Sequence, residues 1–461
     1  MTGFRYGSTS LMAAIIAVVI PSCGSSQEPG HTDPIEDAAA GGRDSMASVG
    51  WHDAASDLPG DGAAFYPADG GSAIVGTVLD FGTFRPLADR RVSIGSRTAT
   101  TDGQGRFTLI DIPATYDVVV RDREGSTISV YRGLSRRDPV LPHKGLPPPA
   151  TQTATVRGDV SGVGKYPLAA GDFVDFYFFS ELADNGVSIG GASESLGPGY
   201  GPLRLTWGSA QPISGRFVAF GTFGEGSSSF GFFDQPLTLA AGQSAVVNVA
   251  LTPVTATHHI SGTIQLPRDS GIALKGAFHK LPMIHATIEL FASHDPSSSF
   301  DYLVPDLSRL GGQLCVAAAS SPQLSVTQRC GLSVGQKEIA LILEPAPTLV
   351  TPTAGLNVTR DTRFEWTAFG GGVHLLELEP TIVGATSPNI YVFTAGTSVG
   401  WPEIESLGVS FPAGARYGIT VVGLGPHATL DESLGQNGLV APSPVELRRS
   451  YSQTSFSSMS L

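Results

Sequence analysis

Apolar and polar residues alternate along much of the chain after residue 23. Arg91–Ile94 (RVSI) and Arg106–Leu109 (RFTL) are two examples, and Tyr116–Val120 is dense in β-branched residues. A period of two is typical of a half-buried strand, whereas a helix repeats its apolar residues every three to four positions. Sustained helical spacing is hard to find in this part of the chain. The pattern therefore predicts an all-β protein made of short strands.

Similar segments recur at domain-sized intervals. The pattern I/V-x-G-x-V/I occurs at 74–78, 156–160 and 260–264. Repeats at this spacing favour an array of related domains, and 461 residues suit three or four of them. We predict tandem β-sandwich domains after a signal peptide and a disordered acidic linker. The predicted boundaries are 73–143, 152–253, 256–345 and 346–448 for the sandwiches, and 449–461 for a disordered tail.

Two of these segments resemble known families. In 73–143, a G-x-V opening followed by TDGQGRFTL and YDVVV resembles the carboxypeptidase regulatory-like domain, a transthyretin-like β-sandwich. That resemblance implies a supporting or spacing role and no peptidase chemistry. Residues 346–448 resemble a fibronectin type III or immunoglobulin-like sandwich. This second resemblance implies that Trp366 is the buried core tryptophan and Tyr417 the corner tyrosine.

The first 23 residues have the form of an export signal. A charged start precedes ten apolar residues, Leu11–Ile20, which are too few for a membrane span of about 20. The segment Ile20–Cys23 (IPSC) resembles the lipobox of bacterial lipoproteins. The resemblance implies removal of the signal 1–22, a lipid on Cys23 that anchors the protein to a membrane, and sorting to the outer membrane by Gly24. Ordinary secretion with cleavage nearby is the alternative.

Negative charge is concentrated just behind this signal. The formal net charge is −13, and nine acidic residues face only Arg43 in the stretch that follows Cys23. High charge with few β-branched residues gives little to bury, so we predict a disordered acidic tether over 23–72. The sequence shows no basic face of the kind that binds nucleic acid, so we do not expect a nucleic-acid partner.

Cys315 and Cys330 remain as one pair once Cys23 is assigned to the lipid. An exported protein meets an oxidising compartment in which disulfides persist. We predict a Cys315–Cys330 disulfide, which would contribute about 3 kcal/mol through the unfolded state. Two free buried thiols are the alternative. A metal site is disfavoured because no histidine stands between or beside the two cysteines.

Serine and Arg-Gly-Asp motifs do not point to chemistry. The pattern G-x-S-x-G occurs around Ser188, Ser333 and Ser398. A nucleophile elbow needs a strand before the serine and a helix after it, and the sequence does not predict that order at any of the three. The tripeptide 157–159 (RGD) falls inside a repeated strand opening, so an adhesive loop is not expected there.

The other polar residues considered as catalytic or metal-binding candidates do not point to such a site either. Glu377 and Glu379 share one face of a predicted strand, and we interpret them as a solvated strand face rather than an acid–base or calcium pair. Several histidines of the third sandwich lack metal-site spacing and are interpreted as loop and surface residues: His258, His259, His279, His285 and His294. The sequence contains no P-loop, Rossmann fingerprint or C-x-x-C. We predict no catalytic residue, no metal and no cofactor.

The remaining candidate for a ligand-binding surface is a set of aromatic side chains. The segments 173–179 and 215–233 are rich in phenylalanine, and the outward half of their side chains would form an exposed patch. Loops at the sandwich ends are a second candidate. We therefore expect a lipid-anchored cell-envelope protein with a binding or structural role, and a carbohydrate or protein ligand. The alternatives are an unrecognised envelope hydrolase or its accessory module, and a mechanical spacer that presents a partner.

Overall fold

A computed structural model places strands throughout the chain, as the alternation predicted. Among the described residues, two short helices, α2 (Trp401–Ser406) and α3 (Leu430–Ser433), accompany them, together with one 3-10 turn, η3 (Ser308–Leu310). No helix in the described part of the chain is long and apolar enough to cross a membrane. The structure describes residues 72–81, 85–145, 152–163, 172–180, 199–208, 211–224, 229–281, 287–322, 324–352, 361–380, 387–409, 416–439 and 446–458.

The first sandwich consists of two sheets. One has the order β4-β1-β7, with β1 antiparallel to β4 and parallel to β7. The other contains β3-β2-β5-β6. The strands are β1 (Ile74–Asp80), β2 (Arg91–Ile94), β3 (Arg97–Thr100), β4 (Arg106–Leu109), β5 (Tyr116–Arg121), β6 (Thr127–Leu134) and β7 (Val140–His143).

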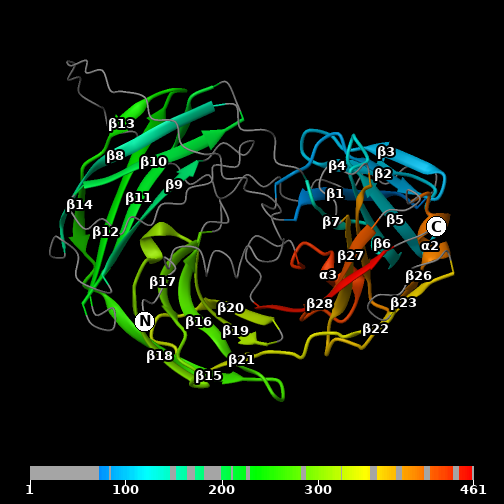
Figure 1. Cartoon of the computed structure of the whole chain (residues 1–461). Helices are drawn as coiled ribbons and strands as arrows, with labels where there is room; N and C mark the ends of the chain where they lie inside the picture. Colours follow the sequence, from blue (N-terminus) through cyan, green and yellow to red (C-terminus); the bar gives the residue numbers. More distant parts are fainter. Residues whose placement is uncertain are drawn as a thin grey trace.

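The second of these sheets continues into the C-terminal part of the chain. β6 pairs in parallel with β25 (Asn389–Thr394), and β24 (Val373–Pro380) and β27 (Arg416–Gly425) follow. Figure 1 shows the blue strands of the first sandwich beside the orange and red strands of the last. The small sheet of the last sandwich has the order β22-β23-β26, from β22 (Leu349–Thr351), β23 (Arg363–Trp366) and β26 (Ser398–Gly400).

The first and last sandwiches also share a hydrophobic core. The Phe393 ring stacks on Tyr131 at 4.9 Å between centroids and meets Phe81 edge-on at 6.1 Å. Leu375 and Leu424 join the same cluster from β24 and β27. Segments predicted as two separate sandwiches thus cover one another. On the opposite face, Trp366 and Tyr417 are buried in the core of the last sandwich.

The second sandwich is one continuous seven-stranded sheet, in the order β10-β8-β14-β12-β11-β9 with β13 beside β8. The tripeptide 157–159 lies inside β8, as the sequence suggested, and pairs with β10 and β13. The strands are β8 (Gln152–Gly162), β9 (Phe173–Ser180), β10 (Gly199–Trp207), β11 (Ile213–Phe223), β12 (Ser229–Leu239), β13 (Ser244–Val246) and β14 (Val249–Pro253).

The expected aromatic patch on this sandwich is not exposed, and that prediction is wrong. Phe176 and Phe178 face the core of the second sandwich. The outward set, including Phe179, Phe220 and Phe232, packs into the core of the third. Both faces of β9 and β11 are therefore largely buried, because the neighbouring sandwich covers the face that an isolated domain would leave in water.

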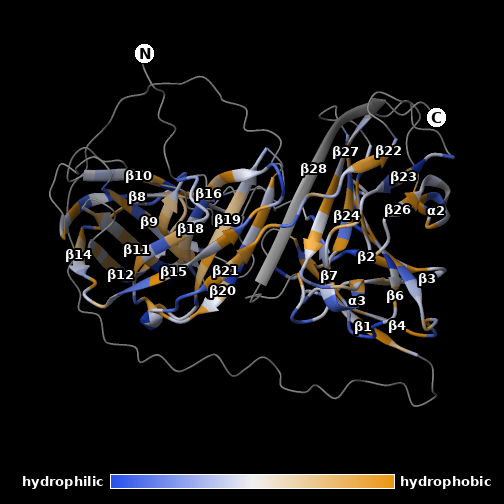
Figure 2. Ribbon diagram, turned by 90° about the horizontal axis from the view of Figure 1, so that it is seen from below, coloured by the Kyte–Doolittle hydropathy of each residue, from blue (hydrophilic) through white to orange (hydrophobic). Residues whose placement is uncertain are grey.

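The third sandwich places the sheet β18-β15-β21 against β17-β16-β19-β20. Cys315 and Cys330 form a disulfide between β19 and β20, and both are buried beside Phe278. The strands are β15 (Thr257–Gln265), β16 (Gly271–Lys280), β17 (Thr287–Ser293), β18 (Ser299–Pro305), β19 (Gln313–Ser321), β20 (Ser325–Leu332) and β21 (Ile339–Ile342). Figure 2 shows apolar positions, in orange, on the strands of both halves of the molecule.

The C-terminal strand joins the two halves. β28 (Glu446–Ser458) pairs antiparallel with β27 along most of its length and with β20 through Ser325–Arg329. The result is a twelve-stranded sheet that runs from β17 to β3. The prediction of a disordered tail over 449–461 is therefore wrong for residues up to 458. Sheet pairing uses backbone groups, so a serine-rich segment without a strong apolar pattern can still complete a sheet.

Deleting residues 446–461 should make the protein self-associate. The deletion leaves β20 and β27 as sheet edges with unpaired backbone groups, which invite pairing with another chain. We expect multi-angle light scattering to give dimers or larger species at concentrations where the full chain keeps a lower mass. Deleting only 459–461, beyond β28, is the matched control. A monodisperse 446–461 deletion of unchanged oligomeric state would contradict this role of β28.

Candidate functional site: a polar groove in the third sandwich

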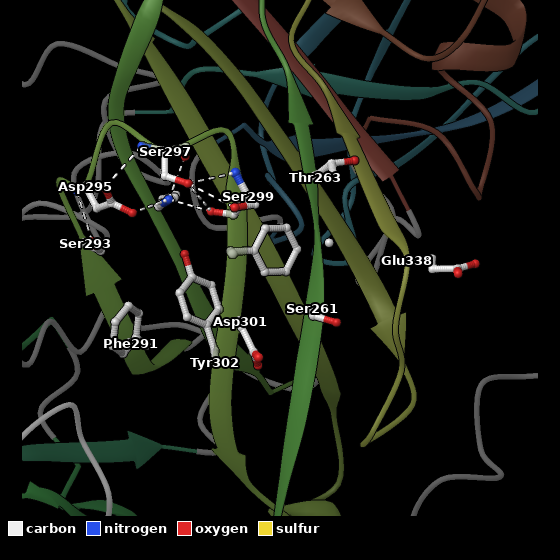
Figure 3. A pocket seen from close by; sticks show the side chains of 13 residues that line it. Ser261, Thr263, Phe291, Ser293, Asp295, Ser297, Ser299, Asp301, Tyr302 and Glu338 are labelled. Atoms are coloured by element: carbon white, nitrogen blue, oxygen red, sulfur yellow. Dashed lines mark hydrogen bonds and ion pairs between the residues drawn. The ribbon is translucent and has the colours of Figure 1, made fainter.

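A groove of about 590 Å³ opens on the third sandwich, where β15, β17 and β18 meet. Its lining combines hydroxyls, carboxylates, aromatic rings and one lysine. Figure 3 shows the side chains that line it, among them Ser261, Thr263, Phe291, Asp295, Asp301 and Tyr302.

The lysine has a structural task. Lys275 on β16 is almost fully buried, and its Nζ donates to Asp295 Oδ2 at 2.9 Å and to the carbonyls of Ser297 and Ser299 at 2.6 and 2.7 Å. Three acceptors use all three ammonium hydrogens. The hydrogen bond from Lys275 lowers the pKa of the Asp295 carboxyl below its ordinary value. Lys275 thus fixes the loop 294–298 at the edge of the groove and has no proton left to donate to a ligand.

An aromatic row forms one wall. Phe291, which is half-buried, contacts Tyr302 at 4.4 Å between centroids, and Phe300 lies 5.2 Å beyond. The Tyr302 hydroxyl is buried and has no hydrogen-bond partner among the described residues. Figure 3 shows this hydroxyl directed toward the loop that carries Asp295 and Ser297. Burial raises the pKa of Tyr302, so the phenol is neutral and can both donate and accept.

A row of polar side chains lies on the outward face of β15 and β18, the face opposite to that of Phe300 and Tyr302. Ser261 on β15 lies opposite Asp301 on β18, and Thr263 lies opposite Ser299. His259, two residues before Ser261, contacts Asp301 through Nδ1 at 2.8 Å. Because residues two apart share a face of a strand, this row points outward on one side of the sheet. It offers hydroxyl and carboxylate groups at the surface.

A second, smaller hollow of about 310 Å³ lies where the second and third sandwiches meet. Its charges are already paired: Arg216 forms a two-point ion pair with Asp234, and the Arg309 guanidinium lies 4.6 Å from the Phe232 ring centroid. Bidentate pairing of this kind stabilises the contact between the strands. We therefore interpret this hollow as part of the junction.

Two carboxyl groups meet at the same junction, and sequence reasoning missed them. Asp175 on β9 is buried and accepts a hydrogen bond from Tyr177 at 3.3 Å. Glu289 on β17 faces it from the third sandwich, and the two carboxylates repel each other. Burial raises the pKa of Asp175 to about 6, and burial together with Asp175 raises that of Glu289 to about 7. The only sign of this pair in the sequence was one acidic residue, Asp175, inside an aromatic strand. Its partner Glu289 lies far along the chain, so the sequence could not indicate that the two meet.

The serine motifs fall in three different settings. Ser188 lies outside the described residues. Ser333 is in the turn after β20, and its N–H donates to Gln336. Ser398 lies within β26 and accepts a hydrogen bond from Arg363 at 2.7 Å. Helix α2 does follow β26, contrary to the sequence reading, but Ser398 sits in the strand and not at the strand–helix turn.

Histidines and carboxylates have mostly structural partners. His279 is buried and donates from Nε2 to the Gly311 carbonyl at 2.6 Å. The interpretation of Glu377 and Glu379 as a solvated face is wrong, since the first sandwich covers that face: Glu377 is buried, and Glu379 accepts from Lys144 at 3.0 Å and Tyr391 at 2.8 Å. No group of three or more metal-ligating side chains occurs among the residues that the structure describes. Cys23 and His285 lie outside those residues.

A buried Ser–His contact in the first sandwich is also structural. Ser129 Oγ lies 2.8 Å from His143 Nδ1, and both residues are fully enclosed. Burial lowers the pKa of His143 to about 3, with nearby Arg90 acting in the same direction. The imidazole is therefore neutral at ordinary pH. Enclosure by the core leaves no approach for a substrate, so this pair serves packing.

No protein-family model matches the chain, and no curated protein matches it. Among solved structures it is similar to the Bacillus anthracis TIE protein, at 8% identity and a TM-score of 0.16 over 59% of this chain and 50% of that protein, so it spans half of that protein's length. A putative cell adhesion protein from Bacteroides fragilis matches 46% of the chain at 10% identity and a TM-score of 0.14, over 97% of its own length. The FN1-FN3 domains of chicken CNTN1 match 77% of the chain at 10% identity and a TM-score of 0.13, over 92% of theirs. Similarities of this size carry no argument about function.

Proposed function

We propose that this is a lipid-anchored bacterial cell-envelope protein whose linked β-sandwiches hold a binding surface away from the membrane. The observation that carries the binding role is the groove of the third sandwich, along which β15 and β18 present an outward row of polar side chains. The aromatic strands of the second sandwich are excluded as the surface because they are covered. A carbohydrate or a protein segment is the class of ligand that such a groove suits.

The anchoring part of the proposal rests on the sequence. An apolar run that ends in Ile20–Cys23 resembles a lipobox, and the resemblance implies an acylated Cys23 followed by an acidic tether over 23–72. Gly24 suggests the outer membrane. The seven strands of 73–143 in two sheets support its assignment as a carboxypeptidase regulatory-like sandwich, and burial of Trp366 and Tyr417 supports a fibronectin type III or immunoglobulin-like sandwich at the C-terminal end.

Replacing Cys23 by serine should release the protein from membranes. Serine carries no thiol for acylation, and two or more acyl chains are what make such an anchor stable, at about 0.8 kcal/mol per buried methylene. We expect the variant to be in the soluble fraction of Gram-negative cells rather than in the membrane pellet, as detected by immunoblots of the two fractions. Ser25→Ala, two residues away, is the control and should stay in the pellet. A Cys23→Ser protein that remains in the membrane fraction would refute lipid anchoring.

A further inference from the structure

Strand β18, which borders the groove, has a neighbouring strand on one side only. It pairs with β15 and with no other strand in the described part of the chain. A hydrogen bond flanks this pairing at each end: the Ile264 N–H donates to the Ser298 carbonyl at 2.7 Å, and the Asp306 N–H to the Ala256 carbonyl at 2.9 Å. Hydrogen-bonded and non-hydrogen-bonded residues alternate along an antiparallel strand, so the even-numbered residues of β18 bond to β15. The odd-numbered residues direct their backbone groups to the open edge.

Two residues on this open edge keep their backbone groups free. At Ser299 both groups are used, because the carbonyl accepts from Lys275 at 2.7 Å and the N–H donates to Ser297 Oγ at 3.2 Å. The N–H and C=O groups of Asp301 and Leu303 have no hydrogen-bond partner among the described residues. Asp301 is exposed and Leu303 half-buried. A row of free donors and acceptors of this kind is what an added strand pairs with.

The charge beside this edge selects the side chain that an added strand would carry. Asp301 contributes a carboxylate on the outward face, and His259 Nδ1 contacts only one of its oxygens, at 2.8 Å. Lys275 is the one cation among the described lining residues, and its three hydrogens are already donated. Opposite charges directly across two strands stabilise their pairing, whereas like charges destabilise it. A lysine or arginine opposite Asp301 is therefore favoured.

On its other face the same edge borders an apolar surface. Phe300 and Tyr302 belong to the core of the third sandwich, and the half-buried Phe291 of β17 contacts Tyr302 at 4.4 Å between ring centroids. Figure 3 shows Phe291 and Tyr302 side by side on the two strands, and all three rings line the groove. Successive residues of a strand point to opposite faces, so the two neighbours of the basic residue would point toward these rings. Apolar residues suit those two positions.

We propose that β18 binds an extended segment of another protein as an added strand, with a basic residue opposite Asp301 and an apolar residue on either side of it. The proposal rests on the proposed binding function and names its ligand class. The backbone of the segment pairs with Asp301 and Leu303, whereas Ser261 and Thr263 lie one strand further away. The tether 23–72 of this chain does not fit, because its charge is negative. The β18 strand of a second copy would bring another Asp301 and no basic residue.

The test measures binding of short fluorescent peptides to the full chain, produced with Cys23→Ser, by fluorescence anisotropy. The peptide Ser-Thr-Val-Lys-Val-Thr-Ser has the required alternation. We expect it to bind about tenfold more tightly than its twin with glutamate in place of lysine, because an attraction to Asp301 becomes a repulsion. Methylation of the lysine backbone nitrogen removes a hydrogen bond to the edge and should abolish binding. Hydrogen exchange at the amides of Asp301 and Leu303 should slow when the lysine peptide binds.

Variants of the chain test the same contacts from the other side. Asp301→Asn should weaken binding of the lysine peptide several-fold and remove its advantage over the glutamate twin. Leu303→Pro lacks the N–H at the open edge but can keep its pairing with β15, and it should abolish binding. Asp269→Asn removes the same charge from an exposed turn of this sandwich outside the groove, and as the matched control it should bind as the parent does. Equal binding of the two peptides, or binding that backbone methylation and Leu303→Pro leave unchanged, would overturn the proposal.

Further outcomes separate the ligand class from the binding function. If chitin hexamer or maltohexaose bound and no peptide did, the added strand would be wrong while the groove remained a binding site. If neither sugars nor peptides bound, the proposed binding function would fail with it. Self-association of the chain that Leu303→Pro abolished would make a second copy the occupant, and would also overturn a segment of another protein.

Discussion

Replacing Phe393 by alanine should lower the free energy of unfolding by about 3–5 kcal/mol, the usual cost of removing a buried phenylalanine. Its ring is 1% exposed and lies between Tyr131 of β6 and Phe81, which follows β1. The cavity therefore opens between the first and last sandwiches. Because β25 and β6 also share hydrogen bonds along one sheet, both sandwiches should be destabilised together. Chemical denaturation followed by tryptophan fluorescence and circular dichroism measures the loss.

Hydrogen exchange identifies which part of the molecule loosens. In Phe393→Ala, exchange should rise in the amides of 74–143 as well as in those of 363–439. Phe223→Ala, in the core of the second sandwich, is the control and should leave both segments protected. If Phe393→Ala loosened only the last sandwich, the shared core would not be an energetic unit. Equal loosening in the control would show that the effect is general.

Raising the pH from about 4 to about 7.5 should weaken the junction between the second and third sandwiches. Asp175 and Glu289 have folded pKa values of about 6 and 7, above the ordinary 3.8 and 4.5. The folded state thus binds their protons more tightly than the unfolded state does, so their contribution is fully present below pH 4. It is lost as the pH rises through 6 and 7. The shift corresponds to about 3 kcal/mol for Asp175 taken alone.

The measurement compares free energies of unfolding of the parent chain and Asp175→Asn at several pH values. Asparagine stays neutral and still accepts from Tyr177, so the variant should be similar to the parent at pH 4 and more stable at pH 7.5. Comparing the two chains at each pH is required because His143 and His374, with pKa values lowered by burial to about 3 and 4, act in the opposite direction. Parallel pH profiles for the two chains would refute the effect. Glu289→Gln provides an independent check from the other side of the junction.

Local elements were predictable from the sequence because they depend on neighbouring residues. The alternating segments Arg91–Ile94 and Arg106–Leu109 are β2 and β4 with the same bounds. The parallel pairing of β6 with β25 was not predictable, since it is made by backbone groups that every residue carries. β28 escaped prediction for the same reason: two strand edges specify its place, and its own apolar pattern is weak.

The groove of the third sandwich could not be predicted from the sequence either, because it depends on contacts between distant segments. Its residues come from β15, β16, β17 and β18, from the loop between β17 and β18, and from Glu338 just before β21. Only Ser261, Gly262 and Thr263 fall in a sequence pattern, the repeat at 260–264, and that repeat predicts a strand rather than a site. Asp295 and the third-sandwich histidines were visible only as isolated polar residues. Lys275 could not be recognised, because an ordinary lysine becomes a buried three-bond anchor only when the loop 294–298 folds over it.

By itself the sequence determined the all-β class, the position of many strands, the face each residue takes on its own strand, and the expectation of export with a lipid on Cys23. The tertiary structure decided which of those faces meet water. The alternation of side chains along β9 predicts only that Tyr177 and Phe179 point to one face of the strand, and Phe176 and Phe178 to the other. Whether the outward face is a binding surface depends on what packs there, and packing between sandwiches joins segments far apart in the chain. The aromatic face was therefore buried, and the polar row of the third sandwich remained accessible.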